Sequence, residues 1–457
     1  MNPAPRLRRP PHRLVLLLAL AGSCLVPAAS ASAAAPTDAE APLSGAALSV
    51  KGWAAGTRGG AGGRIVRVTT LAADGPGSFA EAVRGTGARI VVFEVGGVID
   101  LGGDSVRIRE PHLTIAGQTA PAPGITLVRG ELNVATHDVI VQHIAVRPGE
   151  NGQPKRSGTS LDGLSLRSAH DVVIDHCSFT WATDENLSAS GPRFTGDTPQ
   201  QWRQGTSHRV TFSHNIIAEG LRDSVHEKGE HSKGTLIHDN AEEVLLYGNL
   251  YDSNQERNPL VKGGARVAVV NNLIHNPGGR AVHYNLIAHE WVPHAWQDGE
   301  VTLVGNVYRA GPDTRPGVPL FSLGGAGDVR LHLRDNIAVD QDGNPLPQTG
   351  SYTASGARIV EAGAPYLPDG LRAKPAAEVE RALYAGVGMR PWARDPIDFK
   401  IISDVAEGRG RIVDSEAESS GYPRREATTR PFREADWNLQ DMSPKAGWAS
   451  LWTTPGA

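Results

Sequence analysis

A short strand-like pattern recurs along the middle of the chain. Each copy begins with an apolar residue, and most copies carry a polar or small residue five positions later. Most copies alternate apolar with polar or small residues at least in part, as a strand with one buried face does. Successive copies start 23 to 38 residues apart, and they occupy residues 113–118, 139–144, 172–177, 210–215, 244–249, 267–272, 301–306 and 331–336.

Repetition at this spacing predicts a solenoid. Helical spacing is nearly absent from the region, and connections of variable length between short strands favour an all-β parallel β-helix over a propeller or a sandwich. A leucine-rich solenoid would need a Leu-x-x-Leu-x-Leu register, which is missing. A β-sandwich is the alternative that the pattern leaves open.

Asparagine ends five successive copies of the pattern. If each copy belongs to one coil, these side chains lie above one another at the same bend, where they can hydrogen-bond along the stack and tolerate left-handed backbone. Cys177 takes this position in the preceding copy, so we predict that it packs in the ladder rather than acting as a reactive thiol. The asparagines are Asn215, Asn249, Asn272, Asn306 and Asn336.

Residues 1–35 read as a secretory signal peptide. An apolar run at 14–26 precedes small residues with Ala-x-Ala sites ending at Ala31 or Ala33. The run is short for a bilayer span, which disfavours a membrane anchor. Secretion and an extracellular location are therefore predicted. The basic residues before the run are Arg6, Arg8, Arg9 and Arg13.

The flanks of the repeat predict a cap and an extension. Residues 78–84 read as a short helix with Ser78 as N-cap, suited to closing the open end of the solenoid. We assign the β-helix with this cap to residues 36–345. We expect residues 346–457 to pack on the solenoid as irregular, extended chain, because prolines punctuate them at Pro365, Pro368 and Pro375.

Composition narrows the functional classes. The 457 residues include 53 Gly and only 5% aromatics, which suits thin stacked layers rather than one thick core. Without residues 1–35 the chain keeps one cysteine and loses four Arg, so its formal charge changes from −4 to −8. No intramolecular disulfide can then form, and bulk charge disfavours nucleic-acid binding.

Acidic residues gather where the repeat is most polar. Asp162, Asp175, Asp184 and Glu185 fall within 24 residues, on neighbouring coils that a solenoid stacks about 4.8 Å apart. Carboxylates at that spacing repel unless a cation lies between them, and Ca²⁺ accepts several oxygens in irregular geometry. Asp162 precedes Gly163 and is either a turn residue or a ligand. Asp175 stands inside a strand, where no propensity favours a lone acid.

The sequence resembles the pectate lyases of polysaccharide lyase family 1, in particular secreted bacterial members. The segments that carry the resemblance are VVFEVGGVIDL, LTIAGQTAPAPGITL, DGLSLRSAHDVVIDHCSFTWATDENLS, HEKG, ERNPLV and DPIDFKIISDVAEGRGRIVDSEAE, in this order over most of the chain. The resemblance implies a right-handed parallel β-helix, dependence on Ca²⁺ and β-elimination on polygalacturonate. It also implies an acidic polysaccharide as partner.

The resemblance also implies roles for individual acids. Asp175 matches the Asp of the family's Ile-Asp-His segment and is implied to be a calcium ligand. Asp184 matches the first member of an acidic pair, whose second position is Ser188 in this chain. This departure removes an expected ligand, and either Glu185 replaces it or substrate carboxylate completes a weaker site.

Three basic residues complete the implied site. Arg257 begins Arg-Asn-Pro-Leu-Val-Lys and matches the arginine to which the family assigns the role of Brønsted base. Lys262 stands at the second basic position of that motif, where it lacks the bidentate grip of an arginine. Lys228 matches the substrate-binding lysine. His226, His231 and His238 do not keep the usual spacing of zinc ligands, so the sequence does not predict a zinc site.

These residue types suit elimination on a uronic acid. Removing the proton on C5 builds negative charge beside the C6 carboxylate, and cations bound to that carboxylate neutralise it. A free arginine has a pKa above about 12, so its role as base requires an unusual environment or alkaline pH. A β-helix glycoside hydrolase and a non-catalytic polysaccharide-binding protein are the alternatives. We expect a monomer without nucleic-acid or membrane partners.

Overall fold

A computed structural model describes residues 52–453. The predicted signal peptide, residues 1–35, lies outside the described residues. Between residues 52 and 453 no helix has both the length and the apolar character needed to cross a membrane.

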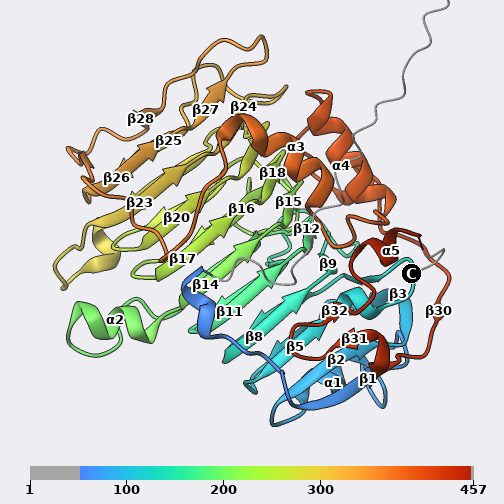
Figure 1. Cartoon of the computed structure of the whole chain (residues 1–457). Helices are drawn as coiled ribbons and strands as arrows, with labels where there is room; N and C mark the ends of the chain where they lie inside the picture. Colours follow the sequence, from blue (N-terminus) through green and yellow to red (C-terminus); the bar gives the residue numbers. More distant parts are fainter. Residues whose placement is uncertain (1–51, 454–457) are drawn as a thin grey trace, which may run out of the picture. The chain divides into compact units, whose positions relative to one another are not determined.

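The repeated runs form one parallel sheet, here called the first sheet (Figure 1). All eight run starts share one register, from Leu113 beside Val139 to Val301 beside Leu331. The predicted strand in each coil is therefore confirmed. The strands are β1 (Arg64–Val68), β2 (Arg89–Phe93), β5 (Leu113–Ala116), β8 (His137–Gln142), β11 (His170–Asp175), β14 (His208–Ser213), β17 (Glu242–Tyr247), β20 (Arg266–Val270), β23 (Gly299–Val304), β26 (Val329–Arg334) and β29 (Ile359–Glu361).

A second sheet receives the last strand of each coil. Its strands are parallel and their order again follows the chain, so each coil stacks on the one before it. They are β4 (Ser105–Ile108), β7 (Glu131–Val134), β10 (Leu164–Arg167), β13 (Glu185–Ser190), β16 (Lys233–Ile237), β19 (Leu260–Lys262), β22 (Val282–Leu286), β25 (Phe321–Gly325) and β28 (Thr349–Ser351).

A third sheet lies between these two along the chain, so that each coil runs from the first sheet through the third to the second. The described residues thus form an all-β parallel β-helix, as predicted. The parallel strands of the third sheet are β3 (Val95–Asp100), β6 (Ile125–Val128), β9 (Ile144–Arg147), β12 (Ser178–Thr180), β15 (Ile216–Ala218), β18 (Leu250–Asp252), β21 (Leu273–His275), β24 (Val307–Arg309) and β27 (Ile337–Val339).

Alternation along the strands fills the interior. In β11, Val172 and Ile174 belong to the large apolar core between the sheets, whereas Val173 faces outward. Val173 is nevertheless buried, because Ala54 of the 3-10 helix η1 (Gly52–Gly56) packs over it. β-branched residues suit such half-buried pleated positions, and the same pattern in every coil makes the core continuous along the axis.

The predicted asparagine ladder is present. Each side-chain amide donates to the side-chain oxygen of the next asparagine, from Asn215 to Asn249 at 3.0 Å and on to Asn336. Cys177 occupies the preceding level, where its backbone N–H donates to Asn215 Oδ1 and burial raises the pKa of its thiol. The left-handed backbone falls one residue before each asparagine, for instance at His214 and Asn271, rather than on the ladder residues themselves.

Short helices and the tail surround the coils. The expected cap is α1 (Phe79–Arg84), whose N-cap Ser78 accepts a hydrogen bond from the backbone of Glu81. The other elements are α2 (Pro199–Gly205), α3 (Ala376–Gly386), α4 (Pro396–Ala406), α5 (Ala449–Thr453), β30 (Thr428–Thr429), β31 (Trp437–Asn438), β32 (Ser443–Pro444) and the 3-10 helices η2 (Gly117–Thr119), η3 (Ala288–Trp291), η4 (Glu416–Glu418) and η5 (Glu434–Asp436).

The tail after β29 is more regular than the prolines suggested. α3 and α4 pack their apolar faces, including Leu383 and Ile401, on outward residues of the third sheet such as Leu250. The chain then returns toward the start of the solenoid, where β30 pairs with β3 and Trp437 packs near the first strands (Figure 1). Prolines begin or precede both helices, at Pro375 and Pro396, where a missing N–H costs nothing.

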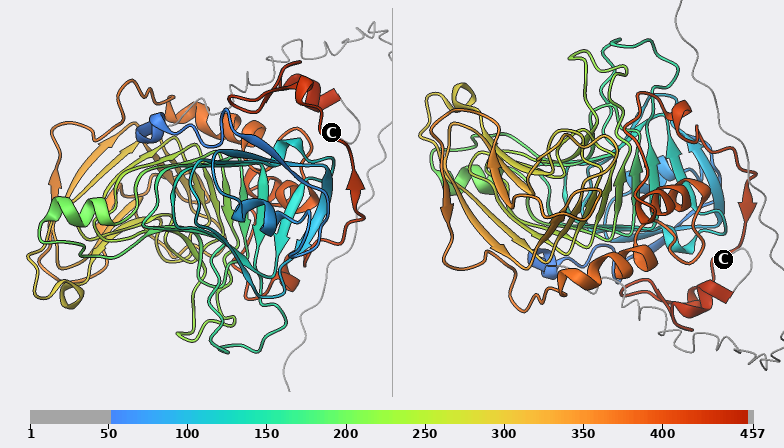
Figure 2. Two further views of the ribbon diagram at one scale, coloured as in Figure 1. Left: turned by 90° about the horizontal axis from the view of Figure 1, so that it is seen from below. Right: turned by 90° about the horizontal axis from the view of Figure 1, so that it is seen from above.

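Two long connections leave the coils side by side. Residues 148–161 lie between the third and second sheets in one coil, and residues 219–232 do so in a later coil. The backbone N–H groups of Arg156 and Gly158 donate to the carbonyls of Ser224 and Val225. Figure 2 shows both loops, teal and green, projecting on the same side. They border the second sheet, where the acidic residues lie.

Candidate active site

Three carboxylates meet where strands of the second sheet begin. Glu185 is the first residue of β13, Asp184 precedes it, and Asp162 lies two residues before β10. One oxygen of each lies within 4.8 Å of the others. A cavity of about 420 Å³ opens over them and is lined by Glu131, Ser160, Asp162, Arg167, Ser168, Asp184, Glu185, Ser188, Ser190, Gly191, Pro192, Leu236 and His238.

Asp162 is a member of this group rather than only a turn residue. Its Oδ1 accepts from the backbone N–H of Glu185 at 3.1 Å, and its Oδ2 accepts from Ser188 Oγ at 2.9 Å. Burial, together with the charges of Asp184 and Glu131, raises the pKa of Asp162 well above its usual range. Ser188, which stands where the family carries an acid, therefore supports Asp162 through a hydrogen bond.

The acidic group fits a calcium ion. Two oxygens that each bind Ca²⁺ at about 2.4 Å lie at most ~4.8 Å apart, which matches the separation of the three carboxylates. A cation would also relieve the repulsion that raises the pKa of Asp162. Glu185 contributes least, because Arg257 already neutralises it.

Arg257 lies directly beside these acids. Its Nη1 forms an ion pair with Glu185 Oε1, and only 23% of its side chain is exposed. Burial lowers the pKa of the guanidinium from its ordinary value, although the charges of Asp184 and Asp162 oppose the shift. Its backbone is left-handed, with φ of 64°, just before β19. The structure thus brings Arg257, Asp184 and Glu185 together, as the sequence analysis expected.

Lys233, which the sequence analysis did not select, lies in the same row. It begins β16, pairs in register with Glu185 of the preceding coil, and forms an ion pair with Glu256. Burial, with Arg280 nearby, lowers the pKa of Lys233 to about 8. Lys228 instead lies exposed in the 219–232 loop. The repeated run marks only strands of the first sheet. The sequence therefore did not indicate which second-sheet residues lie side by side, and Lys233 could not be selected from it.

Curated relatives are similar to the chain over most of its length. A protein named "Probable pectate lyase C" from Aspergillus terreus is 31% identical over 81% of this chain and 80% of its own. Its namesake from Neosartorya fischeri is 32% identical over the same shares. The chain belongs to the pectate lyase family. No family model matches the sequence.

A solved structure agrees with the fold of this pectate lyase family member. The cedar pollen allergen jun a 1 superposes with a TM-score of 0.53 at 16% identity, covering 75% of this chain and 93% of its own. This likeness shows the fold, a right-handed parallel β-helix, as the sequence resemblance implied. Membership of the family also makes the protein a polysaccharide lyase.

Lys262 is enclosed by acids in this pectate lyase family member. Its ammonium lies 2.6 Å from Glu290 Oε2 and 3.2 Å from Asp239 Oδ2, and Arg193 contacts the same two carboxylates. Only 10% of the Lys262 side chain is exposed. Its charge is therefore already shared between two carboxylates on the far side of β19 from Arg257.

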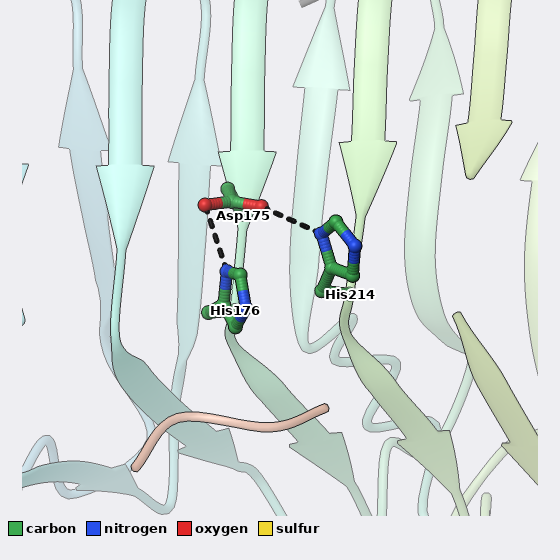
Figure 3. A group of neighbouring side chains, drawn as sticks. All are labelled: Asp175, His176 and His214. Atoms are coloured by element: carbon green, nitrogen blue, oxygen red, sulfur yellow. Dashed lines mark hydrogen bonds and ion pairs between the residues drawn. The ribbon is translucent and has the colours of Figure 1, made fainter. Parts of the chain in front are cut away.

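Asp175 lies in a different sheet and in a different group of side chains. It ends β11, and its carboxylate accepts from His176 Nδ1 at 2.8 Å and His214 Nδ1 at 3.3 Å (Figure 3). Ser213 Oγ and Gln142 Nε2 donate to it as well. The structure does not bring Asp175 together with Asp184 and Glu185.

The surroundings of Asp175 are those of a packed polar core. Despite its burial, contacts with His176 and His214 hold its pKa well below the usual range. The ring of His143 stacks on that of His176 and contacts Trp392 and Trp448 of the tail. A cation at this carboxylate would have to displace donors that already satisfy it.

Arginines extend the groove toward the start of the solenoid. Arg107, Arg109 and Arg167 line a second cavity of about 280 Å³ with Glu131, Asn133 and Ala135. Glu131 and Arg167 line both cavities, so the two lie next to each other. No single stretch of sequence reveals this basic extension, because Arg107 lies in β4, Arg109 just after it and Arg167 in β10.

Proposed function

We propose that the protein cleaves pectate, or a closely related polyuronate, by calcium-assisted β-elimination. The observation that carries the proposal is the ion pair between Arg257 and Glu185, which belongs to a group of three carboxylates with Asp184 and Asp162 at one groove. The relatives' name supports pectate as the substrate class. An acidic polymer also suits the arginines that continue the groove.

Asp162 and Asp184 are the residues we assign to calcium, with Glu185 completing the group. When bound, the ion neutralises the C6 carboxylate of the substrate and so acidifies the neighbouring C5 proton. Asp175 is left out of this site in our assignment, because it belongs to the first sheet and its four donors satisfy it.

Arg257 is the residue we assign to removing the C5 proton. A largely buried guanidinium whose pKa is lowered by burial is a better base than a free one. Alkaline conditions favour the deprotonated form. Arg257 takes the C5 proton, the C5–H electron pair becomes the C4–C5 double bond, and the oxygen on C4 departs with the C4–O pair and takes a proton from water.

Substrate carboxylates have two sets of partners in this proposal. Lys233 lies at the acidic group, one strand from Glu185, and we assign it the substrate contact that the sequence analysis gave to Lys228. Lys228 can reach substrate only from the exposed loop. Lys262 is paired with Glu290 and Asp239, and we assign it a positioning role through these carboxylates.

The predicted signal peptide supports action outside the cell, where pectic polymers occur as substrates. We propose that the mature protein is extracellular and monomeric. Sedimentation of the purified mature chain, together with detection of the protein in culture medium of an expressing host, tests both statements.

The decisive experiment follows unsaturated product. The mature chain is incubated with polygalacturonate at alkaline pH, with Ca²⁺ or with chelator, while ultraviolet absorbance is recorded. We expect absorbance to rise with Ca²⁺, and Arg257→Ala to lower the rate at least ~10³-fold, as loss of a proton-transferring group does. Arg358→Ala is the matched control, since Arg358 is 77% exposed and pairs only with Asp328 at the surface.

Other outcomes have definite meanings. Reducing ends without absorbance would mean hydrolysis and would reject elimination. Retention of the polymer without either product would leave a polysaccharide-binding protein.

A further inference from the structure

Two histidines of the 219–232 loop face Asp184. His226 and His231 stack with ring centroids 3.5 Å apart, and both side chains are more than nine-tenths buried. The Nε2 atom of His226 lies 3.6 Å from Asp184 Oδ2, and that of His231 lies 3.6 Å from Asp184 Oδ1. One oxygen or nitrogen of each of the three residues lies within 4.8 Å of the others.

Hydrogen bonds at Nδ1 define what His231 presents to Asp184. Its Nδ1 lies 3.2 Å from the Gly229 carbonyl, which can only accept, so the proton of the neutral ring is on Nδ1. The lone pair of Nε2 then points at Asp184 Oδ1, which is also an acceptor. Two acceptors facing each other call for a cation between them.

The 3.6 Å separation of the two acceptor atoms is also close to that of two ligands of one metal ion. Nitrogen and oxygen ligands that each bind zinc at about 2.0–2.2 Å lie ~3.3–3.5 Å apart at a tetrahedral angle. A hydrogen bond would bring the two atoms to about 2.7–3.2 Å. The neighbouring Ser160 Oγ donates to Asp184 Oδ2 at 2.9 Å, which leaves Oδ1 to face His231.

We propose that His231 and Asp184 bind a transition-metal cation of the Zn²⁺ class, in competition with calcium. An imidazole nitrogen favours Zn²⁺, Cu²⁺ or Ni²⁺, whereas a set of carboxylates alone favours Ca²⁺. Asp184 belongs to both groups and can serve only one cation fully. Zinc bound by His231 therefore removes Asp184 from the calcium site, which makes the lyase sensitive to transition metals; this consequence rests on the proposed function.

His226 takes a supporting part. Its Nδ1 accepts from the backbone N–H of Lys228 at 3.2 Å, which places the proton of the neutral ring on Nε2. That atom faces Asp184 as a donor rather than a ligand. Stacking on His231 fixes the ring that does bind the ion.

Calorimetric titration with Zn²⁺ alone and with Ca²⁺ alone tests the proposal on the mature chain. We expect His231→Ala to weaken Zn²⁺ binding at least tenfold and to change Ca²⁺ affinity by less than threefold. Asp184→Asn should weaken both. His289→Ala, at an exposed histidine, is the control and should change neither. His231→Gln, which keeps a polar side chain, is the second variant if His231→Ala unfolds.

Binding of Cu²⁺ gives an independent readout. Its electron paramagnetic resonance spectrum should show nitrogen coupling that His231→Ala removes, while His214→Ala retains it, which separates this site from the group around Asp175. Unchanged Zn²⁺ affinity in both His231 variants would overturn the proposal. If no lyase activity is found yet Zn²⁺ binding depends on His231, the metal inference stands and the proposed function falls. If Ca²⁺-dependent lyase activity is found and Zn²⁺ does not change it, the proposed function stands and the metal inference falls.

Discussion

Two groups of acids and histidines lie on different sheets of the same solenoid and differ in how their polar atoms are satisfied. Around Asp175, four donors reach one carboxylate at 2.7–3.4 Å, and tail residues cover the neighbouring His143. Around Asp184, three acids crowd one another and the nearest imidazoles stand 3.6 Å away. The first group is complete without a ligand, and the second is not.

Residue type alone therefore does not identify a binding site, because both groups contain an aspartate and two histidines. An Asp-His pair in the strand pattern drew attention to Asp175 in the sequence, yet its structure is that of a buried hydrogen-bond network, which rigidifies a core. The carboxylates of the groove have fewer hydrogen-bond donors around them, and uncompensated negative charge of this kind favours binding of a cation.

The largest effect is expected at the groove. Asp184→Asn should lower Ca²⁺ affinity about 100-fold, or ~2.7 kcal/mol, because a charged ligand is lost from the centre of the acidic group. Elimination at fixed Ca²⁺ should fall in parallel, measured by ultraviolet absorbance, while the unfolding midpoint stays the same or rises. An unchanged Ca²⁺ affinity would place the cation elsewhere.

At Asp175 the opposite result is expected. Asp175→Asn replaces one accepting oxygen by an amide that meets His176 or His214 donor to donor, which should cost about 2–3 kcal/mol of unfolding free energy. Urea unfolding measures the loss, and Ca²⁺ affinity should not change. Asp342→Asn, on an exposed turn, is the control. If Asp175→Asn abolished Ca²⁺ binding without lowering stability, Asp175 would be a calcium ligand after all.

Two lysines near the groove should differ in their effect on catalysis. Lys233→Ala should lower kcat/KM about tenfold or more, since a buried ammonium beside Glu185 is removed, whereas Lys228→Ala should change it less than threefold. Initial rates over a range of polygalacturonate concentrations measure both. Reversed magnitudes would restore Lys228 as the substrate-binding residue.

A further prediction concerns acid stability beside Asp175. Burial lowers the pKa of His143 to about 3, below its ordinary value of 6.5, so the unfolded chain takes up the proton first as pH falls. The stability that the neutral His143 ring contributes to the folded state is fully present above pH 6.5. It is lost progressively toward pH 3, at no more than about 1.4 kcal/mol of unfolding free energy per pH unit. His143→Gln should flatten this part of the stability curve, whereas His289→Gln, at the surface, should leave its slope unchanged.

The sequence by itself determined the solenoid and its register. Strand starts from Leu113 to Leu331 could be aligned because every coil buries the same face, and the asparagines between them could be stacked because hydrogen bonding along the axis repeats with the coil. Arg257 and Asp184 were selected as candidates from the sequence, since both stand in short contiguous motifs.

Tertiary structure alone decided which charged residues meet. Asp162, Glu185 and Lys233 are neighbours only because three coils of different length bring their second-sheet strands into register. His231 reaches Asp184 through a loop whose path no local pattern encodes. A strand's inward face follows from alternation along one segment, but contacts across coils depend on the length of every coil between them, and successive runs start 23 to 38 residues apart.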